Sequence, residues 1–237
     1  MFRFFVNKKI KDNFLIERKD THHIKNVIKL QVGEKIECVF ENNVYLSEIS
    51  DLSQSDIVLA KELQLIKTNS VKVQKTLIAG VLREQKWDWL LQKATELGVD
   101  QIVPVVFSRN VVKIDINKKA NKVKRWQTIC DTAAKQSKRN NIPLVCDIVE
   151  DIYELKQYLN DINLVAWEEE LDIPLNNYLE NDFNSISFII GCEGGIDIKE
   201  IKKLNAIGFN NVSLGNNILR AETAPLYILS SLIYLNK

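Results

Sequence analysis

The sequence has few residues of the kinds that bind metals or build disulfide frameworks. Its 237 residues include four cysteines and two histidines. The cysteines are Cys38, Cys130, Cys146 and Cys192. They are far apart, with no CxxC pair and no histidine at metal-ligand spacing, which argues against a zinc site and a disulfide framework. The adjacent His22 and His23 would point about 100° apart on a helix and could not easily share a metal. We therefore expect no metal and reduced thiols, as in a cytoplasm.

The chain also lacks long apolar runs and an excess of either charge. No stretch approaches the roughly eighteen consecutive apolar residues of a membrane span. The N-terminal MFRFFVNKKIKDN lacks the apolar core and small residues of a signal peptide. The 32 Lys and Arg nearly balance 31 Asp and Glu, for a formal charge of +1. We expect neither export nor a membrane span, and any nucleic-acid site must be a local basic patch.

The first 66 residues favour short strands around one helix. Strands are expected at 2–6, 34–40, 44–49 and 57–63, with a hairpin turn at 41–43. Thr21 is the expected N-cap of a helix that Gly33 closes. The pattern is typical of a small β-barrel or sandwich. A polar stretch at 64–72 marks a boundary, which gives domains 1–68 and 69–237.

The second part alternates apolar strands with helical patterns, which is typical of an α/β fold with a mostly parallel sheet. Strands are expected at 73–81, 101–106, 162–167, 185–190 and 211–214, and helices at 84–97, 118–138 and 224–235. Two further helices are expected to open at Asp151 and Asp197. Trp87, Leu91 and Trp126 fall on apolar helix stripes, so we expect core or dimer packing there rather than base stacking.

Two glycine turns follow strands in this second part. The first is FIIGCEGGID (188–197) and the second lies in SLGNNILRAETA (213–224). Neither matches the P-loop or the GxGxxG dinucleotide fingerprint. Glu193 would repel a phosphate but suits an ammonium or a sulfonium, while Asp197 and Glu200 have the spacing of a capping pair. The glycines could serve tight turns alone, but in a parallel sheet both loops would meet at the ligand-binding edge.

Together with motifs earlier in the chain, these two loops match the sequence pattern of a known protein family. The motifs are RFF (3–5), HHIKNVIKLQVGEKI (22–36), QKATELGVDQIVP (92–104), RWQTICDTAAKQSKRNNIP (125–143), IIGCEGGID (189–197) and SLGNNILRAETA (213–224). In this order they resemble the ribosomal RNA small-subunit methyltransferase E family of the SPOUT superfamily. The resemblance covers nearly the whole chain.

The resemblance implies a two-domain enzyme. It implies a PUA-like β-barrel for RNA, followed by an α/β domain whose C-terminal part forms a trefoil knot. In the family, S-adenosylmethionine lies bent in the knot loops, and its methyl group goes to N3 of a uridine in 16S rRNA near the decoding centre. The resemblance also implies a homodimer, with each site completed across the interface.

The site residues are carried over by position. The cofactor-binding residues implied are Trp167, Glu168, Gly191, Glu193, Gly194, Gly195, Leu214, Gly215, Asn217, Ile218 and Leu219. Arg220 is the candidate for orienting the base or stabilising the uracil anion, and the alternative is an ion pair with Glu222. Glu222 and Glu96 are candidate proton acceptors, and the alternative for each is an ordinary position on a helix surface.

The RNA-binding candidates form two basic groups. They are Arg3, His22, His23, Lys25 and Lys29 in the small domain, and Lys135, Lys138 and Arg139 on the long helix. Phosphate contact is their natural role, and a solvated surface is the alternative.

Three positions depart from the family pattern. Cys192 replaces a usual proline, Ala221 a frequent threonine, and Lys29 a usual arginine. Losing the proline frees the backbone of the cofactor loop. This motivates a second hypothesis, a non-catalytic RNA-binding or ribosome-assembly protein with the same fold. A third is a knotted methyltransferase that acts on another RNA.

Overall fold

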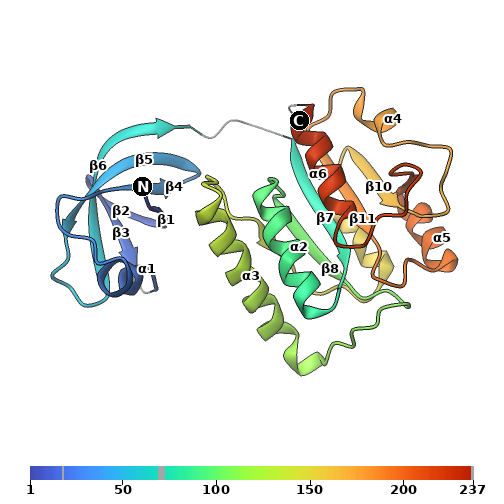
Figure 1. Cartoon of the computed structure of the whole chain (residues 1–237), viewed down its shortest axis with the longest axis horizontal. Helices are drawn as coiled ribbons and strands as arrows, with labels where there is room; N and C mark the ends of the chain where they lie inside the picture. Colours follow the sequence, from blue (N-terminus) through green and yellow to red (C-terminus); the bar gives the residue numbers. More distant parts are fainter. Residues whose placement is uncertain (18, 69–72, 236–237) are drawn as a thin grey trace. The chain divides into compact units, whose positions relative to one another are not determined.

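The chain folds into two compact units. The structure is a computed structural model that describes residues 1–17, 19–68 and 73–235. One unit comprises Met1–Val71 with Ala134–Asn141, and the other comprises Lys72–Ala133 with Ile142–Lys237 (Figure 1). Part of the expected boundary at 64–72 lies outside the described residues, and the division at 68/69 stays a prediction.

The first unit is built on a six-stranded sheet. Its order is β1 (Arg3–Phe5), β4 (Lys35–Phe40), β5 (Asn43–Asp51), β6 (Ile57–Lys67), β3 (Asn13–Glu17) and β2 (Lys8–Ile10). β1 and β4 are parallel and the other neighbours are antiparallel. Apolar side chains that include Phe4, Phe14 and Ile36 form the core of this unit. The ring of Phe14 lies 5.1 Å from that of Tyr45, so strands distant in sequence are joined by aromatic contact.

The β2–β3 hairpin does not appear in the sequence prediction. All three residues of β2 are exposed, so the strand has no apolar alternation to reveal it. Lys11 makes the turn with φ 52°. Lysine rarely adopts this left-handed conformation, so its presence in the sequence does not indicate a turn. The hairpin turn at 41–43 is confirmed, since Glu41 and Asn42 have φ of 49° and 62° before β5 begins.

Two expectations about the first helix are wrong. Thr21 is not its N-cap but lies inside α1 (Lys19–His22), buried, where its hydroxyl donates to the carbonyl oxygen of Ile16 at 2.8 Å. A π-helical turn, His23–Val27, follows. Lys29, not Gly33, takes the left-handed conformation just after it, with φ 53°. Gly33 instead donates its N–H to Ile49 in the approach to β4.

The second unit confirms the expected α/β fold with a parallel sheet. The strand order is β12 (Asn210–Val212), β10 (Ile162–Ala166), β11 (Ser185–Ile190), β7 (Gln74–Gly80), β8 (Gln101–Val105) and β9 (Leu144–Val145). Every neighbouring pair is parallel. The helices are α2 (Glu84–Glu96), α3 (Lys119–Gln136), α4 (Asn176–Leu179), α5 (Ile198–Ile207) and α6 (Ala224–Tyr234). Short 3-10 turns span Ile116–Lys118 and Ile152–Tyr158, so the segment after Asp151 is not an α-helix.

Helices cover both faces of this sheet. Alternate residues of the central strands feed two apolar clusters, because successive side chains of a strand point to opposite faces. On one face Phe188 packs with Trp87 of α2 and Ile228 of α6. On the other, Ile189 packs with Ile201 of α5. Trp87 and Trp126 meet with ring centroids 5.3 Å apart, which confirms core packing for both. In the described part of the chain, no helix has the length and apolar character to cross a membrane.

Candidate active site

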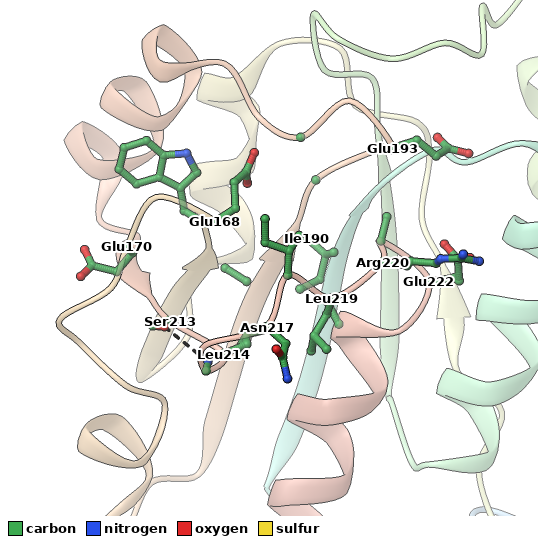
Figure 2. Close-up of a pocket in the computed structure, with 18 of the residues that line it drawn as sticks. Glu168, Glu170, Ile190, Glu193, Ser213, Leu214, Asn217, Leu219, Arg220 and Glu222 are labelled. Carbon is green, nitrogen blue, oxygen red and sulfur yellow. Dashed lines mark hydrogen bonds between the residues drawn. The ribbon is translucent and has the colours of Figure 1, made fainter.

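A cavity of about 630 Å³ opens at the carboxyl edge of the parallel sheet (Figure 2). Most of its lining comes from three segments, namely the end of β10 with the residues after it, the end of β11 with the residues after it, and the stretch from the end of β12 to the start of α6, and Lys86 of α2 adds a fourth contribution. Because parallel strands end at the same edge, segments far apart in sequence meet there. Ile190 and Leu219 lie between Glu168 on one side and Arg220 with Glu222 on the other.

The glycines of the first loop have close neighbours, and one of them takes a left-handed conformation. A Cβ atom on Gly191 would lie 2.9 Å from the Ile196 side chain. On Gly195 it would lie 2.4 Å from Oε1 of Glu168, and the φ of Gly195 is 71°. Gly195 also donates its N–H to the carbonyl of Cys192 at 2.9 Å. Gly195 therefore makes a tight turn, and close packing is a second reason for glycine at positions 191 and 195.

Gly80, at the end of β7, is a site-forming residue that the sequence analysis missed. A Cβ atom there would lie 2.5 Å from the backbone nitrogen of Cys192 and 2.9 Å from the carbonyl carbon of Gly191. The loop after β11 thus crosses directly over the end of its neighbouring strand. A glycine late in the apolar run QKTLIAG was the available signal, because strand glycines often mark close backbone approach.

Glu193 connects the first loop to α2. Its Oε1 accepts the backbone N–H of Arg83, the N-cap of α2, at 3.0 Å. A carboxylate in this position also benefits from the helix dipole. Its Oε2 is buried with no hydrogen-bond partner among the described residues. Glu193 lines the cavity as expected, and one of its oxygens serves α2 rather than a ligand.

The segment Phe107–Asn110 holds the outer side of the same loop. Arg109 donates to the Gly194 carbonyl at 3.5 Å and to Asp197 Oδ2 at 3.2 Å. Ser108 donates its backbone N–H and its hydroxyl to Glu200, each at 2.8 Å. The Lys199 backbone N–H, and then Arg109, lower the pKa of Asp197. The expected capping pair of Asp197 and Glu200 is confirmed at the start of α5, and it also anchors this segment.

The second loop is more open. Gly215 has φ 108°, and no atom lies within 4 Å of where its Cβ would be. Its N–H donates to Ser213 Oγ at 3.3 Å, the dashed line in Figure 2. Ile218 is 85% exposed. The Ser213 N–H donates to Ile173 at 2.8 Å, which ties this loop to the segment after β10.

Charged groups gather beside the second loop. Arg220 lines the cavity, is exposed, and has no side-chain partner in the described part of the chain. Glu222 pairs instead with Lys86 of α2, whose Nζ lies 3.3 Å from both of its carboxylate oxygens. Lys86, which also lines the cavity, is a second residue that the sequence analysis missed. It lies far along the chain from Glu222, so spacing could not have revealed the contact.

Comparison with known proteins assigns the family. The profile of the RNA methyltransferase domain matches residues 69–233, and that of the RNA methyltransferase PUA domain matches 16–63. The ribosomal RNA small subunit methyltransferase E of Mesomycoplasma hyopneumoniae is 35% identical over 239 residues, covering 98% of this chain and 99% of its own. The chain belongs to the ribosomal RNA small subunit methyltransferase E family. The Bacillus subtilis member is 32% identical, covering 93% of this chain and 90% of its own.

A solved member of the methyltransferase E family has the same fold. The Neisseria gonorrhoeae enzyme, crystallised with S-adenosylmethionine bound, is 28% identical with a TM-score of 0.85, covering 99% of this chain and 98% of its own. The resemblance inferred from the sequence motifs is therefore confirmed at the level of the family.

Most of the expected cofactor residues converge on the cavity. Those that line it are Trp167, Glu168, Gly191, Glu193, Gly195, Leu214, Gly215, Asn217, Ile218 and Leu219. Gly194 does not line it. A Cβ on Gly194 would lie 2.8 Å from the Arg109 carbonyl oxygen, so this glycine allows the close contact between the first loop and the segment Phe107–Asn110.

The expected catalytic residues are only partly together. Arg220 and Glu222 line the cavity, whereas Glu96 does not. Glu96 ends α2, the helix whose other end lies at the cavity, and pairs with Lys93 at 2.8 Å. The structure gives Glu96 the ordinary helix-surface position.

Several expected RNA-binding residues have partners within the chain. Arg3 pairs with Glu37 at 2.8 Å, with only 8% of its side chain exposed, and Lys135 pairs with Asp20 at 2.6 Å. Lys25 donates to the Gln54 carbonyl. Arg139 donates to Asn141 at 3.1 Å. The remaining expected residues, His22, His23, Lys29 and Lys138, are exposed.

The structure also bears on metal binding and on the state of the thiols. Over residues 1–17, 19–68 and 73–235, no cluster of three or more His, Cys, Asp or Glu could hold a metal ion. The four cysteines are free thiols. Cys192 is a buried residue of the first loop, and its burial raises the pKa of its thiol.

Proposed function

We propose that this chain transfers a methyl group from S-adenosylmethionine to N3 of a uridine in the 16S rRNA of the small ribosomal subunit. The observation that carries the proposal is the cavity in which two backbone loops, an acidic side and an unpaired arginine meet at the carboxyl edge of the sheet. Family membership supports methyl transfer to ribosomal RNA. Such an enzyme would work in the cytoplasm, where ribosomes are assembled.

The residues present fit S-adenosylmethionine. Glu168, Glu170 and Glu193 line the cavity and favour a ligand with positive charge, as the sulfonium and the ammonium are. Ile190, Leu214 and Leu219 provide apolar surface for a purine. Because glycines have no side chain, the backbone of both loops can come close to an adenine edge and a ribose. When bound, the cofactor supplies a methyl group already activated by the positive sulfur.

The chain's own residues must then handle the acceptor. A uracil N3–H is a weak acid, so its deprotonation needs a proton acceptor or a cation beside the forming anion. Arg220 is the candidate to supply that cation, because it lines the cavity and its guanidinium has no partner in the described residues. Glu222, only 13% exposed and held by Lys86, is the candidate to accept or relay the proton.

The knot, the dimer and the domain roles are part of the same proposal. Support for a trefoil knot comes from family membership. We propose that residues 1–68 bind RNA as a PUA-like domain and that residues 69–237 carry the knotted methyltransferase. A homodimer would cover the exposed Ile218, and light scattering at micromolar concentration tests it, with a monomer as the contradicting result.

Two measurements on the purified chain test the proposed activity. Calorimetric titration with S-adenosylmethionine should show binding in the micromolar range. Incubation with labelled cofactor and 16S rRNA, followed by nucleoside mass spectrometry, should show 3-methyluridine. No heat at high micromolar cofactor would instead support the non-catalytic RNA-binding protein. Cofactor binding with methylation of a different RNA would support the third hypothesis.

A further inference from the structure

The basic residues of the second unit concentrate just before and within the first turns of α3. Residues 109–125 contain seven cations and one acid, Asp115. The cations are Arg109, Lys113, Lys118, Lys119, Lys122, Lys124 and Arg125. Over the whole chain, 32 basic residues face 31 acidic ones, so this segment holds a strong local excess of positive charge.

Three of these cations are neutralised within the chain. Arg109 pairs with Asp197, and Lys119 Nζ lies 2.8 Å from Glu150 Oε2. Arg125 pairs with Asp88 at 2.5 Å and Glu84 at 3.2 Å. The single acid, Asp115, caps the 3-10 turn by accepting the Asn117 N–H at 2.9 Å.

Four lysines are left without such partners. The side chains of Lys113, Lys118, Lys122 and Lys124 make no hydrogen bond or ion pair with any residue that the structure describes. Lys122 is half-buried and the other three are exposed. This contrasts with Arg3, Lys25 and Lys135, whose charges are already engaged within the chain.

The lysines lie at the edge of the sheet where the cavity opens. α2 and α3 each return antiparallel to the strand before them, so both helices begin at the carboxyl edge (Figure 1). Arg125 is level with Glu84 and Asp88 in the first turns of α2. Lys122, three residues before Arg125 on α3, lies about 4.5 Å further toward that edge at 1.5 Å rise per residue, and Lys118 ends the 3-10 turn that leads into α3. Lys86, in the first turn of α2, already lines the cavity.

We propose that Lys113, Lys118, Lys122 and Lys124, which surround the start of α3, form a phosphate-binding surface for the RNA whose base enters the cavity. The inference rests on the proposed function, because it assigns the backbone contacts of that same substrate. Ammonium groups on flexible stems bind phosphates as point charges and carry no sequence information. The surface therefore contributes affinity and positions the strand, while the cavity selects the base.

The experiment compares two triple variants with equal loss of charge. The test variant is Lys118→Gln, Lys122→Gln and Lys124→Gln. The control is Lys156→Gln, Lys199→Gln and Lys202→Gln, exposed positions on the 3-10 turn and α5 that cover the opposite face of the sheet. Binding of each to protein-free 16S rRNA is measured between 50 and 200 mM salt, and binding of S-adenosylmethionine is measured by calorimetry.

The test variant should lose affinity for RNA about 10- to 100-fold, and its log–log salt slope should fall by about 2, since each phosphate contact contributes about 0.7–0.9. Its cofactor affinity should equal that of the wild type, which shows that the fold is intact. Equal RNA affinity and equal slope for the test variant, the control and the wild type would overturn the inference. A wild type that binds no cofactor and methylates no RNA would instead overturn the proposed function.

Discussion

The two loops that wall the cavity differ in how firmly the chain holds them. The loop at residues 191–196 crosses Gly80, contacts Glu168, and is fixed by Arg83 and Arg109. The loop at residues 214–220 has open space beside Gly215 and leaves Ile218 85% exposed. The first loop is therefore preorganised, whereas the second can adapt to what binds. We expect the first loop to contribute most of the cofactor affinity, and the second loop to contact the cofactor and also to present Arg220 to the acceptor.

Replacing Arg220 should give the largest loss of activity. Arg220→Ala removes the unpaired cation of the open loop, and removing one such stabilising group lowers kcat about 10²–10³-fold. S-adenosylmethionine affinity should stay within a few-fold of wild type, because no described side chain depends on Arg220. Single-turnover methylation and calorimetry measure the two effects. Methylation near the wild-type rate would remove Arg220 from the mechanism.

Replacing Gly80 should damage the fixed loop most. In Gly80→Ala the new Cβ would meet backbone atoms of Gly191 and Cys192, which cannot move aside as a side chain could. Overpacking of this kind costs about 1–3 kcal/mol. We expect a lower free energy of unfolding in urea and at least tenfold weaker cofactor binding.

Gly215→Ala is the matched change in the open loop. It meets no atom within 4 Å, and only its φ of 108° opposes the substitution. Backbone strain alone should lower the free energy of unfolding by about 1 kcal/mol. If both glycine variants bound S-adenosylmethionine equally well, the difference between the loops would be contradicted.

Replacing Arg109 should have a moderate effect on cofactor affinity. Arg109→Ala removes the donors to Gly194 and Asp197, while Ser108 still holds Glu200. Because the Arg109 side chain is 46% exposed, we expect only about 0.2–1 kcal/mol from its ion pair. The KM for S-adenosylmethionine should rise about two- to fivefold with kcat unchanged. Arg109→Lys should recover part of this loss, and a fall in kcat alone would contradict the positioning role.

Shortening Ile218 should have the smallest effect. Ile218→Ala removes apolar surface that is 85% exposed within the chain, so the free energy of unfolding should not change. If a ligand or a second copy covers this side chain, affinity for that partner should fall about two- to tenfold. Calorimetry and light scattering on the same variant identify which partner is affected.

The sequence predicted the parts of this site that lie next to one another along the chain. Strand alternation located β10 and β11, and the loop glycines identified the two walls. The contacts of Gly80, Lys86 and Arg109 could not be predicted, because each depends on a partner more than eighty residues away. Long-range pairing leaves no periodic trace in local sequence.

The errors in the first unit have a different cause. β2 has three exposed residues, and Thr21 has the chemistry of an N-cap but finds its acceptor in Ile16. Propensity describes what a residue can do, and tertiary context decided which option was used. The basic residues show the same effect, since Arg3 and Lys135 pair with acids of the chain, whereas Lys118 has no such partner among the described residues.

The buried thiol of Cys192 has a consequence for an enzyme that handles an alkylating agent. Thiolates are strong nucleophiles, and a thiolate beside a methylsulfonium could be methylated in place of the substrate. Burial, together with the charge of Glu193, raises the pKa of Cys192. A raised pKa means a smaller thiolate population, so the burial that packs the loop also disfavours methylation of the protein's own thiol.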